Sequence, residues 1–156
     1  RRQKDIAQGV DERLSKFEPV KVTLDGQEFQ ADPAEKRDFE AALAVFRSGK
    51  FAEANTAFAS FMRQYPRSGY GPSARFWLGN AQYAQRDYKE AIGNFKQLLS
   101  DAPSHARAPE AALSIANCQL ELKDNRAARK TLEDLVRVYP QSEAAAAAKE
   151  RLARLK

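Results

Sequence analysis

The sequence is poor in the residues that most enzymatic and metal sites require. Its 156 residues include one cysteine and one histidine. Because Cys118 stands alone, no disulfide can form within the chain, and the cysteine count assigns no redox compartment. Because His105 also stands alone, a metal site of several His and Cys ligands is excluded, as is a catalytic triad that needs another histidine.

Long apolar runs and glycine-rich phosphate loops are also missing from the sequence. No apolar stretch is long enough to cross a bilayer, and no glycine-rich loop has the spacing that cradles a phosphate. The polar start, RRQKD, is not followed by the apolar core of a secretory signal. A cytosolic protein and a mature piece of an exported protein both remain open at this point.

The charge pattern indicates a solvated surface. The net charge is +5, but Lys and Arg are scattered among Asp and Glu and form no basic stripe with interleaved aromatic residues, so we expect no nucleic-acid partner. Cys118 falls on a column of small residues and is expected to be a buried packing residue. His105 follows Pro103 in a link between helices and is expected to lie in an exposed loop.

The organising feature of the sequence is an internal repeat. Three segments begin at Phe51, Tyr88 and Asn125, with offsets of 37 residues (88 − 51 and 125 − 88). The columns that coincide under this offset are Ala54, Ala91 and Ala128; Phe58, Phe95 and Leu132; Phe61, Leu98 and Leu135; and Pro66, Pro103 and Pro140. Agreement at this many columns without a gap predicts a repeat architecture.

Each repeat is predicted to be a pair of helices joined by a short polar turn. Apolar residues in the upstream halves recur at helical spacing, and a small residue in each (Ala42, Gly79 or Ala116) would let the two helices approach closely. We place the repeats at about 34–67, 71–104 and 108–141, within a domain of residues 34–156. The alanine-rich segment 142–155 is predicted to be a capping helix.

The order of Leu-Gly, aromatic, Ala, Phe and Pro over about residues 33–142 resembles the tetratricopeptide (TPR) repeat. The resemblance implies an all-α solenoid of three TPR-type helical hairpins with a terminal capping helix. The period is three residues longer than usual, and we expect the excess, in the links RSGYGP and SHARAP, to extend each first helix by about one turn. Trp77 lies two positions after the usual tryptophan column and is expected to pack on the preceding second helix.

The first 33 residues differ in kind from the repeats. Residues 1–18 carry apolar side chains at alternating spacings of three and four, and the candidate oligomerisation residues are Ala7, Val10, Leu14 and Phe17. This pattern indicates the end of a coiled coil; an amphipathic helix docked on the array is the alternative. Residues 19–33 form a linker in which Val20, Val22 and Leu24 alternate before Asp25-Gly26, and this predicts a small β-hairpin.

By resemblance to TPR arrays, the first helices line a concave groove that binds proteins. The candidate groove residues are Phe39, Leu43, Phe46, Phe76, Asn80, Tyr83, Leu113, Asn117 and Leu120. Some TPR domains hold a carboxylate with a basic residue in the column occupied here by Phe39, Phe76 and Leu113, so that clamp is not expected. The groove suits an amphipathic helix or an extended segment. The asparagines either pair with peptide backbone or stay partly solvated.

Several stretches together resemble the YbgF/CpoB family of Tol-Pal-associated proteins. They are RLSKFEP, VTLDGQEF, FWLGNAQYAQRDYKEAI and YPQSEAAAAAKERL. The resemblance implies a periplasmic, non-enzymatic adaptor without cofactor, metal or small-molecule substrate. Such an adaptor self-associates through its coiled coil, commonly as a trimer, and contacts TolA and a bifunctional peptidoglycan synthase. It thereby coordinates outer-membrane constriction with septal wall synthesis during cell division.

Two other protein classes remain as alternatives. The Tyr-Pro-x-Ser links at residues 65–68 and 139–142 also resemble BamD, a TPR lipoprotein scaffold of outer-membrane β-barrel assembly. A cytosolic TPR co-chaperone is a weaker alternative, because the basic clamp residues are missing. An enzyme is the least favoured class.

Overall fold

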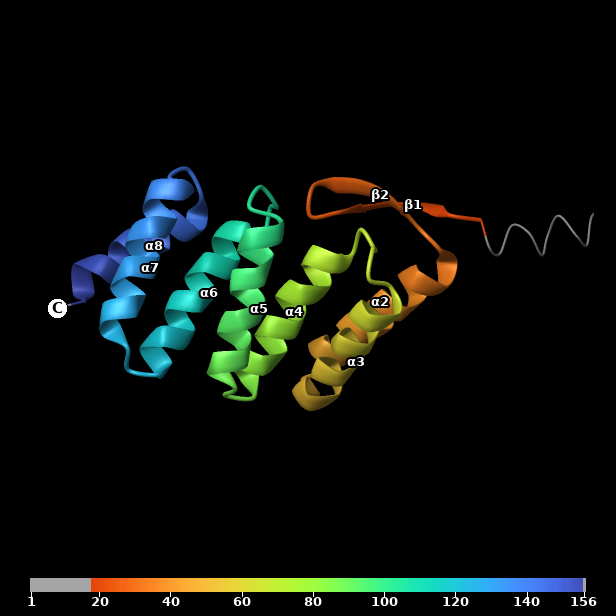
Figure 1. The fold of residues 1–156 in the computed structure, drawn as a ribbon, viewed down its shortest axis with the longest axis horizontal. Coiled ribbons are helices and arrows are strands. Elements are labelled where there is room, and N and C mark those ends of the chain that lie inside the picture. The colour runs from red at the N-terminus through yellow and green to blue at the C-terminus, as the bar shows by residue number, and fades with distance from the viewer. Residues whose placement is uncertain (1–17, 156) are drawn as a thin grey trace, which may run out of the picture.

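The computed structural model describes residues 18–155, which form one β-hairpin followed by a row of seven helices (Figure 1). The strands are β1 (Val20–Leu24) and β2 (Gln27–Ala31); the first helices of the repeats are α2 (Pro33–Arg47), α4 (Gly71–Ala84) and α6 (Ala108–Glu121); the second helices are α3 (Phe51–Gln64), α5 (Tyr88–Asp101) and α7 (Asn125–Val138); and α8 (Glu143–Arg154) ends the array. The predicted coiled-coil segment, with Ala7, Val10, Leu14 and Phe17, lies outside the described residues.

The predicted all-α solenoid of three helical hairpins is confirmed. The second helices begin at residues 51, 88 and 125, which keeps the 37-residue period of the sequence. Successive helices lie side by side along the row (Figure 1). The alanines of the repeat column, Ala54, Ala91 and Ala128, are fully buried, as are Phe58, Phe95 and Leu132. Small residues beside large ones therefore build the same packing unit three times.

Gly79 allows the close approach of α4 and α5 that the sequence predicts. A Cβ atom added at this position would lie 2.7 Å from Cε1 and Cζ of Phe95. A buried polar contact joins the same two helices, because Asn94 Nδ2 donates to Gln82 Oε1 at 2.7 Å. The next repeat uses the equivalent positions, since Thr131 Oγ1 donates to the side-chain oxygen of Gln119 at 2.7 Å.

The turn inside each repeat requires a left-handed backbone at one fixed column. The residues there are Gly49, Arg86 and Lys123, with φ values of 83°, 65° and 62°. Only glycine adopts this conformation without a steric cost. The second and third repeats therefore carry local strain that the first avoids.

Two details of the links differ from the sequence-based expectation. The extension of the first helices is wrong: α2 has 15 residues, and α4 and α6 have 14, the length of each second helix. The extra residues instead form consecutive turns, in which Ser68 N donates to Tyr65 O and Gly71 N donates to Ser68 O. The partners of Trp77 are more numerous than expected: its ring contacts Phe46 of the preceding first helix at 5.1 Å between centroids, and it also packs against the cluster that includes Phe58 and Phe61 of α3.

The predicted hairpin is confirmed in register and turn. Leu24 pairs with Gln27 across Asp25-Gly26, and both turn residues have positive φ (49° and 75°), as a type I′ turn requires. The face with Val20, Val22, Phe29 and Ala31 packs on the helices, whereas Lys21, Thr23, Glu28 and Gln30 are exposed. Alternation along each strand thus separates an inner face from an outer one.

The C-terminal helix is capped and packed as its composition suggests. The Ser142 Oγ atom accepts a hydrogen bond from the backbone N–H of Ala145 at 3.0 Å, which satisfies one free donor of the first turn. Ala144, Ala145 and Ala148 are buried against the third repeat. The alanines therefore close the apolar end of the array.

Candidate functional site

The nine candidate groove residues divide into two groups in the structure. Phe39 and Phe76 are buried, at 2% and 4% exposure. The other seven are partly exposed: Leu43, Phe46, Asn80, Tyr83, Leu113, Asn117 and Leu120. Of the nine candidates, these seven are the ones that a partner can reach.

Rings from neighbouring segments cover the two buried phenylalanines. Phe39 stacks on Tyr70, from the link before α4, with 4.3 Å between ring centroids. Phe76 lies against Phe95 of α5 at 6.0 Å. The guanidinium of Arg107 covers its other side, 5.2 Å from the ring centroid. The resemblance to TPR arrays predicts both phenylalanines in the groove but does not show what lies over them.

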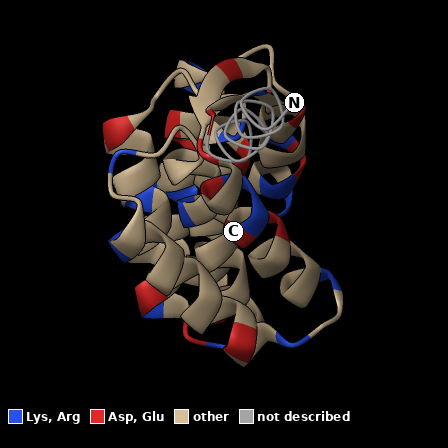
Figure 2. Cartoon of the chain, turned by 90° about the vertical axis from the view of Figure 1, so that its right-hand side faces the viewer, with Lys and Arg blue, Asp and Glu red and all other residues tan. Residues whose placement is uncertain are grey.

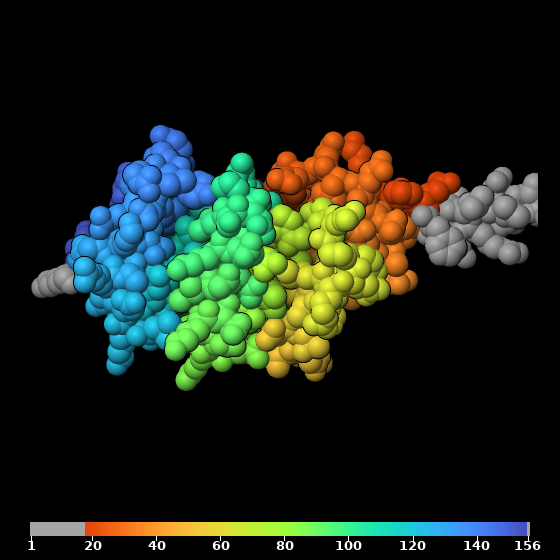
Figure 3. All heavy atoms as spheres, in the orientation of Figure 1, coloured from red at the N-terminus to blue at the C-terminus, as the bar shows by residue number. Residues whose placement is uncertain are grey.

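The β-hairpin is docked on the array beside the first helices α2 and α4. Phe29 meets Tyr70 edge-on at 4.9 Å, and Val22 and Ala31 are buried in the same cluster as Phe39. The fit is tight at Gly69, where an added Cβ would lie 2.4 Å from the Phe29 ring. The hairpin residues lie across one end of the helices, with the turn directed toward the middle of the row (Figures 1 and 3).

The tip of the hairpin is fixed by a polar latch. The Asp25 carboxylate accepts hydrogen bonds from Ser73 Oγ at 2.7 Å and from Arg107 Nε at 3.0 Å. Asp25 and Ser73 are largely withdrawn from solvent, and the Arg107 side chain is 29% exposed. The guanidinium also lies over the Trp77 ring, 5.3 Å from its centroid. The Arg107 side chain is therefore held by charge, by a hydrogen bond and by cation–π contact at the same time.

Sequence reasoning predicted a turn at Asp25 and did not predict this latch. Arg107 lies 82 residues further along the chain, and nothing in the local pattern of either residue indicates a contact. Ser73 lies on α4 three residues before Phe76, one of the candidate groove residues, and that position is the one signal available from sequence. The latch depends on the tertiary fold, which brings the hairpin tip to the start of α6.

The prediction that His105 lies in an exposed loop is wrong. The residue is 5% exposed, and its Nδ1 atom accepts a hydrogen bond from the backbone N–H of Arg107 at 3.0 Å. Burial lowers the pKa of His105 below 6.5, more than the nearby Asp25 carboxylate raises it, and Arg107 also lowers it. The imidazole is therefore a neutral acceptor that shapes the link carrying Arg107.

A groove lies between β1 and α2. Its volume is about 490 Å³, within the range of ligand pockets in proteins. The residues that line it are Lys21, Val22, Thr23, Leu24, Lys36, Phe39, Glu40, Leu43, Arg47 and Tyr70. Those from α2 recur at spacings of three and four, so they occupy one face of the helix. The groove has an apolar floor, and its charged side chains are three basic ones and a single acidic one.

Further along the concave side, Asn80 is held in place by its own helix. Its Nδ2 atom donates to the carbonyl oxygen of Phe76 at 2.8 Å. An amide has two N–H donors and a carbonyl acceptor, so this contact orients the group while using one donor. Tyr83 packs edge-on against Tyr88 at 5.4 Å, and burial raises the pKa of its hydroxyl. Tyr83 therefore remains a neutral donor at physiological pH.

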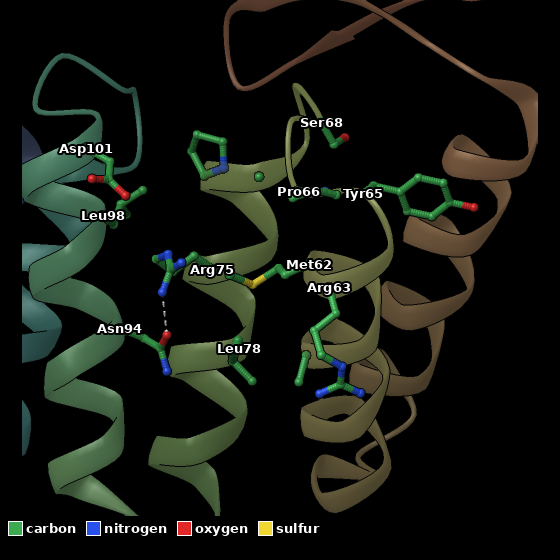
Figure 4. A pocket seen from close by; sticks show the side chains of 13 residues that line it. Met62, Arg63, Tyr65, Pro66, Ser68, Arg75, Leu78, Asn94, Leu98 and Asp101 are labelled. Carbon is green, nitrogen blue, oxygen red and sulfur yellow. Dashed lines mark hydrogen bonds between the residues drawn. The ribbon is translucent and has the colours of Figure 1, made fainter.

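The opposite side of the array carries a second hollow, between α3, α4 and α5. Its volume is about 590 Å³. Figure 4 shows Arg75 directed toward Asn94, and Arg75 Nη1 donates to Asn94 Oδ1 at 2.9 Å. Asn94 also donates to Gln82, as described above. Because these polar groups already satisfy one another, this hollow is a weaker candidate for specific recognition than the concave side.

The remaining candidate group from the sequence, Cys118, is a packing residue in the structure. Cys118 is buried, as predicted, and burial raises the pKa of its thiol to about 11. Among residues 18–155, no three His, Cys, Asp or Glu side chains are grouped to hold a metal ion. Within the same part of the chain, no helix has the length and apolar character of a membrane span. Figure 2 shows acidic and basic residues intermixed on the face it presents.

Comparison with known proteins supports the fold and the predicted resemblance. A family model described as YfiO, outer membrane lipoprotein, matches residues 31–156. The cell division coordinator CpoB of Pseudomonas putida is 38% identical over 63 residues. That match covers 40% of this chain and 24% of CpoB. The resemblance to CpoB is thereby confirmed, although this chain spans only about a quarter of the relative's length.

Solved structures with the same fold have low sequence identity to this chain. PcrH from Pseudomonas aeruginosa superimposes with a TM-score of 0.69 and 16% identity, over 80% of this chain and 93% of PcrH. The TPR domain of OM64 from Arabidopsis gives a TM-score of 0.63 and 14% identity, over 78% of this chain and 95% of that domain. Both confirm the TPR architecture.

Proposed function

We propose that this chain, which belongs to the family described as YfiO, outer membrane lipoprotein, is the protein-binding domain of a non-enzymatic periplasmic adaptor in cell division. The observation that carries the proposal is the concave side of the array. There, seven partly exposed side chains lie on successive first helices, and the hairpin is docked against the first of these helices, α2. A groove of this kind binds a segment of another protein. The similarity to a cell division coordinator supports the process in which it acts.

The finer proposal concerns partners and architecture. Its partners are TolA and a bifunctional peptidoglycan synthase, and it coordinates outer-membrane constriction by the Tol-Pal system with septal peptidoglycan synthesis. Self-association, commonly as a trimer, is proposed to use the candidate residues Ala7, Val10, Leu14 and Phe17, which lie outside the described part of the chain. This part of the proposal rests on the resemblance to CpoB.

The groove proposal is tested by titrating this chain with the periplasmic part of TolA in a calorimeter. The test variant combines Asn80→Ala and Tyr83→Ala, because both side chains are partly exposed on α4. Removal of two central contacts should weaken binding at least tenfold. Phe76 is not a suitable target, since it is buried and its loss would disturb packing.

The matched control is Arg63→Ala, which removes an exposed side chain from the opposite hollow. Circular dichroism should show the same helical content in both variants as in the parent chain. Equal TolA affinity in the groove variant and the control would rule out the concave side as the TolA site.

A second candidate function is a BamD-like scaffold in outer-membrane protein assembly. The specific observation that favours it is the family description, which names an outer membrane lipoprotein. Affinity capture of the full-length protein from envelope extracts separates the two candidates. Recovery of β-barrel assembly components without TolA would favour the scaffold.

A further inference from the structure

The outer edge of β1 borders the groove against α2. In a hairpin with a two-residue turn, the residues of the closing pair, here Leu24 and Gln27, form backbone hydrogen bonds with each other. Residues whose backbone groups face the partner strand alternate with residues whose groups face away. The N–H and C=O groups of Lys21 and Thr23 therefore point to the outer edge. Among residues 18–155, β2 is the strand paired with β1.

That edge faces a surface suited to the side chains of an extended segment. Four consecutive β1 residues line the groove, as expected where a strand edge forms its wall. Across from them, the partly exposed Leu43 supplies apolar surface on α2, while Phe39 and Tyr70 lie almost fully buried beneath the groove. An added strand would direct alternate side chains toward this floor.

Charge indicates the chemistry of the occupant. Lys21, Lys36 and Arg47 line the groove, and all three are exposed. Lys21 also forms an exposed salt bridge of 3.2 Å with Glu28, which lies on β2 outside the groove lining. Glu40 is the single acidic residue among the lining residues, and its contact with Lys36 is long, at 3.9 Å. A surface pair at that distance offsets little of the positive field. The groove therefore favours an acidic segment over a basic one.

The hairpin is held rigidly enough to act as a template. Its middle is fixed by Phe29 against Tyr70, and its tip by the contacts of Asp25 with Ser73 and Arg107. The hairpin is therefore held at two separate points, the centre of β2 and the turn. An edge that is already ordered avoids the entropy of forming a strand on binding.

We propose that the groove between β1 and α2 binds an extended, acidic segment of a partner protein, which adds to β1 as a third strand. Main-chain hydrogen bonds to Lys21 and Thr23 supply the alignment, and the basic rim selects acidic side chains. The inference rests on the proposed function and specifies how the concave side recognises its partner. A bound helix would leave the strand edge unused, because the backbone groups of a helix pair within the helix.

The probe is a capped decapeptide of alternating valine and glutamate, titrated into the isotope-labelled chain. We expect binding with a dissociation constant below 1 mM and slower hydrogen exchange at the Lys21 and Thr23 amides. The same peptide with lysine in place of glutamate should bind at least tenfold more weakly. Failure of the glutamate peptide to bind at 1 mM, or equal binding of the lysine peptide, would overturn the proposal.

Two variants separate backbone pairing from side-chain contact. Thr23→Pro removes the backbone N–H that points to the outer edge. Thr23→Ala removes the exposed side chain but keeps this N–H. Loss of one hydrogen bond should weaken binding about fivefold in the proline variant, with little change in the alanine variant. Equal affinity in all three proteins would exclude strand addition.

A change in the peptide tests the same bond without altering the protein. N-methylation of alternate peptide residues on the edge facing β1 removes the donors that strand addition uses. Methylation in the other register leaves those donors in place and is the control. Equal affinity of the two methylated peptides would contradict the pairing even if Thr23→Pro disturbed the hairpin.

The basic rim is tested by Lys36→Glu together with Arg47→Glu. The control is Lys149→Glu with Lys130→Glu, which makes the same charge change on α8 and α7. Only the groove variant should show weaker binding of the glutamate peptide.

If TolA binding is weakened by the Asn80 and Tyr83 substitutions but not by Thr23→Pro, the strand-addition proposal fails while the adaptor proposal stands. If TolA does not bind and the glutamate peptide still does, the partner assignment fails and the groove chemistry stands.

Discussion

Replacing Gly79 with alanine should destabilise the array, although alanine is the better helix former. The added methyl group would lie 2.7 Å from two ring atoms of Phe95. The Phe95 side chain is fully buried between α4 and its neighbours, so the ring has no free space into which to move. Steric overlap, and not helix propensity, should decide the sign of the effect.

The magnitude follows from two opposing contributions. Gly→Ala inside a helix stabilises by about 1 kcal/mol, and overpacking a core costs about 1–3 kcal/mol. The net loss should be about 1 kcal/mol. Gly93→Ala is the matched control, because Gly93 lies inside α5 and an added Cβ there meets no atom within 4 Å. This control should gain about 1 kcal/mol, so the difference between the two variants isolates the overlap.

Urea unfolding followed by circular dichroism at the helix band is the assay. With a slope of about 2 kcal/mol per molar urea, the midpoint should fall by about 0.5 M for Gly79→Ala and rise by about as much for Gly93→Ala. A midpoint for Gly79→Ala equal to or above that of Gly93→Ala would refute the reasoning.

The third repeat suggests a rescue. It combines alanine and leucine, Ala116 and Leu132, in the two columns that hold Gly79 and Phe95. Phe95→Leu removes the ring that the new methyl group would meet. The double variant should therefore be more stable than the sum of the single effects, by about 1 kcal/mol or more. Additive effects would show that the methyl group meets no resistance from the ring.

The remaining predictions concern the latch, the strained turns and two titrating groups. Asp25→Asn keeps the turn, because asparagine tolerates the φ of 49° at this position. The variant loses the charged contact with Arg107, so amide hydrogen exchange in β1 and β2 should become about tenfold faster. Unchanged exchange rates would show that the latch does not hold the hairpin. Lys123→Gly relieves a φ of 62° and should raise the melting temperature by about 2–4 °C, whereas a fall would contradict strain at that turn. Burial lowers the pKa of His105 in the folded chain below its ordinary 6.5. As the pH falls, the unfolded chain therefore binds the proton first, and the free energy of unfolding should decrease from pH 7 to pH 5. His105→Asn should make this decrease smaller, and an unchanged pH dependence would exclude His105 as its source. The Cys118 thiol, with its pKa raised to about 11, should resist Ellman's reagent at pH 8 until the chain unfolds, and rapid native labelling would contradict its burial.

The fold could be predicted from sequence because its determinants recur at fixed spacing. The alanine and aromatic columns repeat every 37 residues, so each helix pair is specified by local pattern, and Asp25-Gly26 specifies the hairpin turn. Errors arose where the outcome depended on tertiary contacts. The link before α6 folds inward, which buries His105, and sequence spacing contains no information about that.

The candidate site was predicted less completely than the fold, for the same reason. The resemblance to TPR arrays predicted Phe39 and Phe76 in the groove, but Tyr70 and Arg107 cover them. Those covering residues come from links, whose paths are not set by a repeat pattern. The hairpin was predicted as an element, yet its position against α2, which creates the groove, depends on Phe29 and Gly69 fitting together.

Chemical-shift mapping tests most directly the claim that the concave side binds a protein partner. The isotope-labelled chain is titrated with the periplasmic part of TolA, and the amides that shift or broaden are placed on the structure. The account predicts that they cluster on β1 and on the exposed faces of α2, α4 and α6. A cluster confined to α3, α5 and α7 would contradict it.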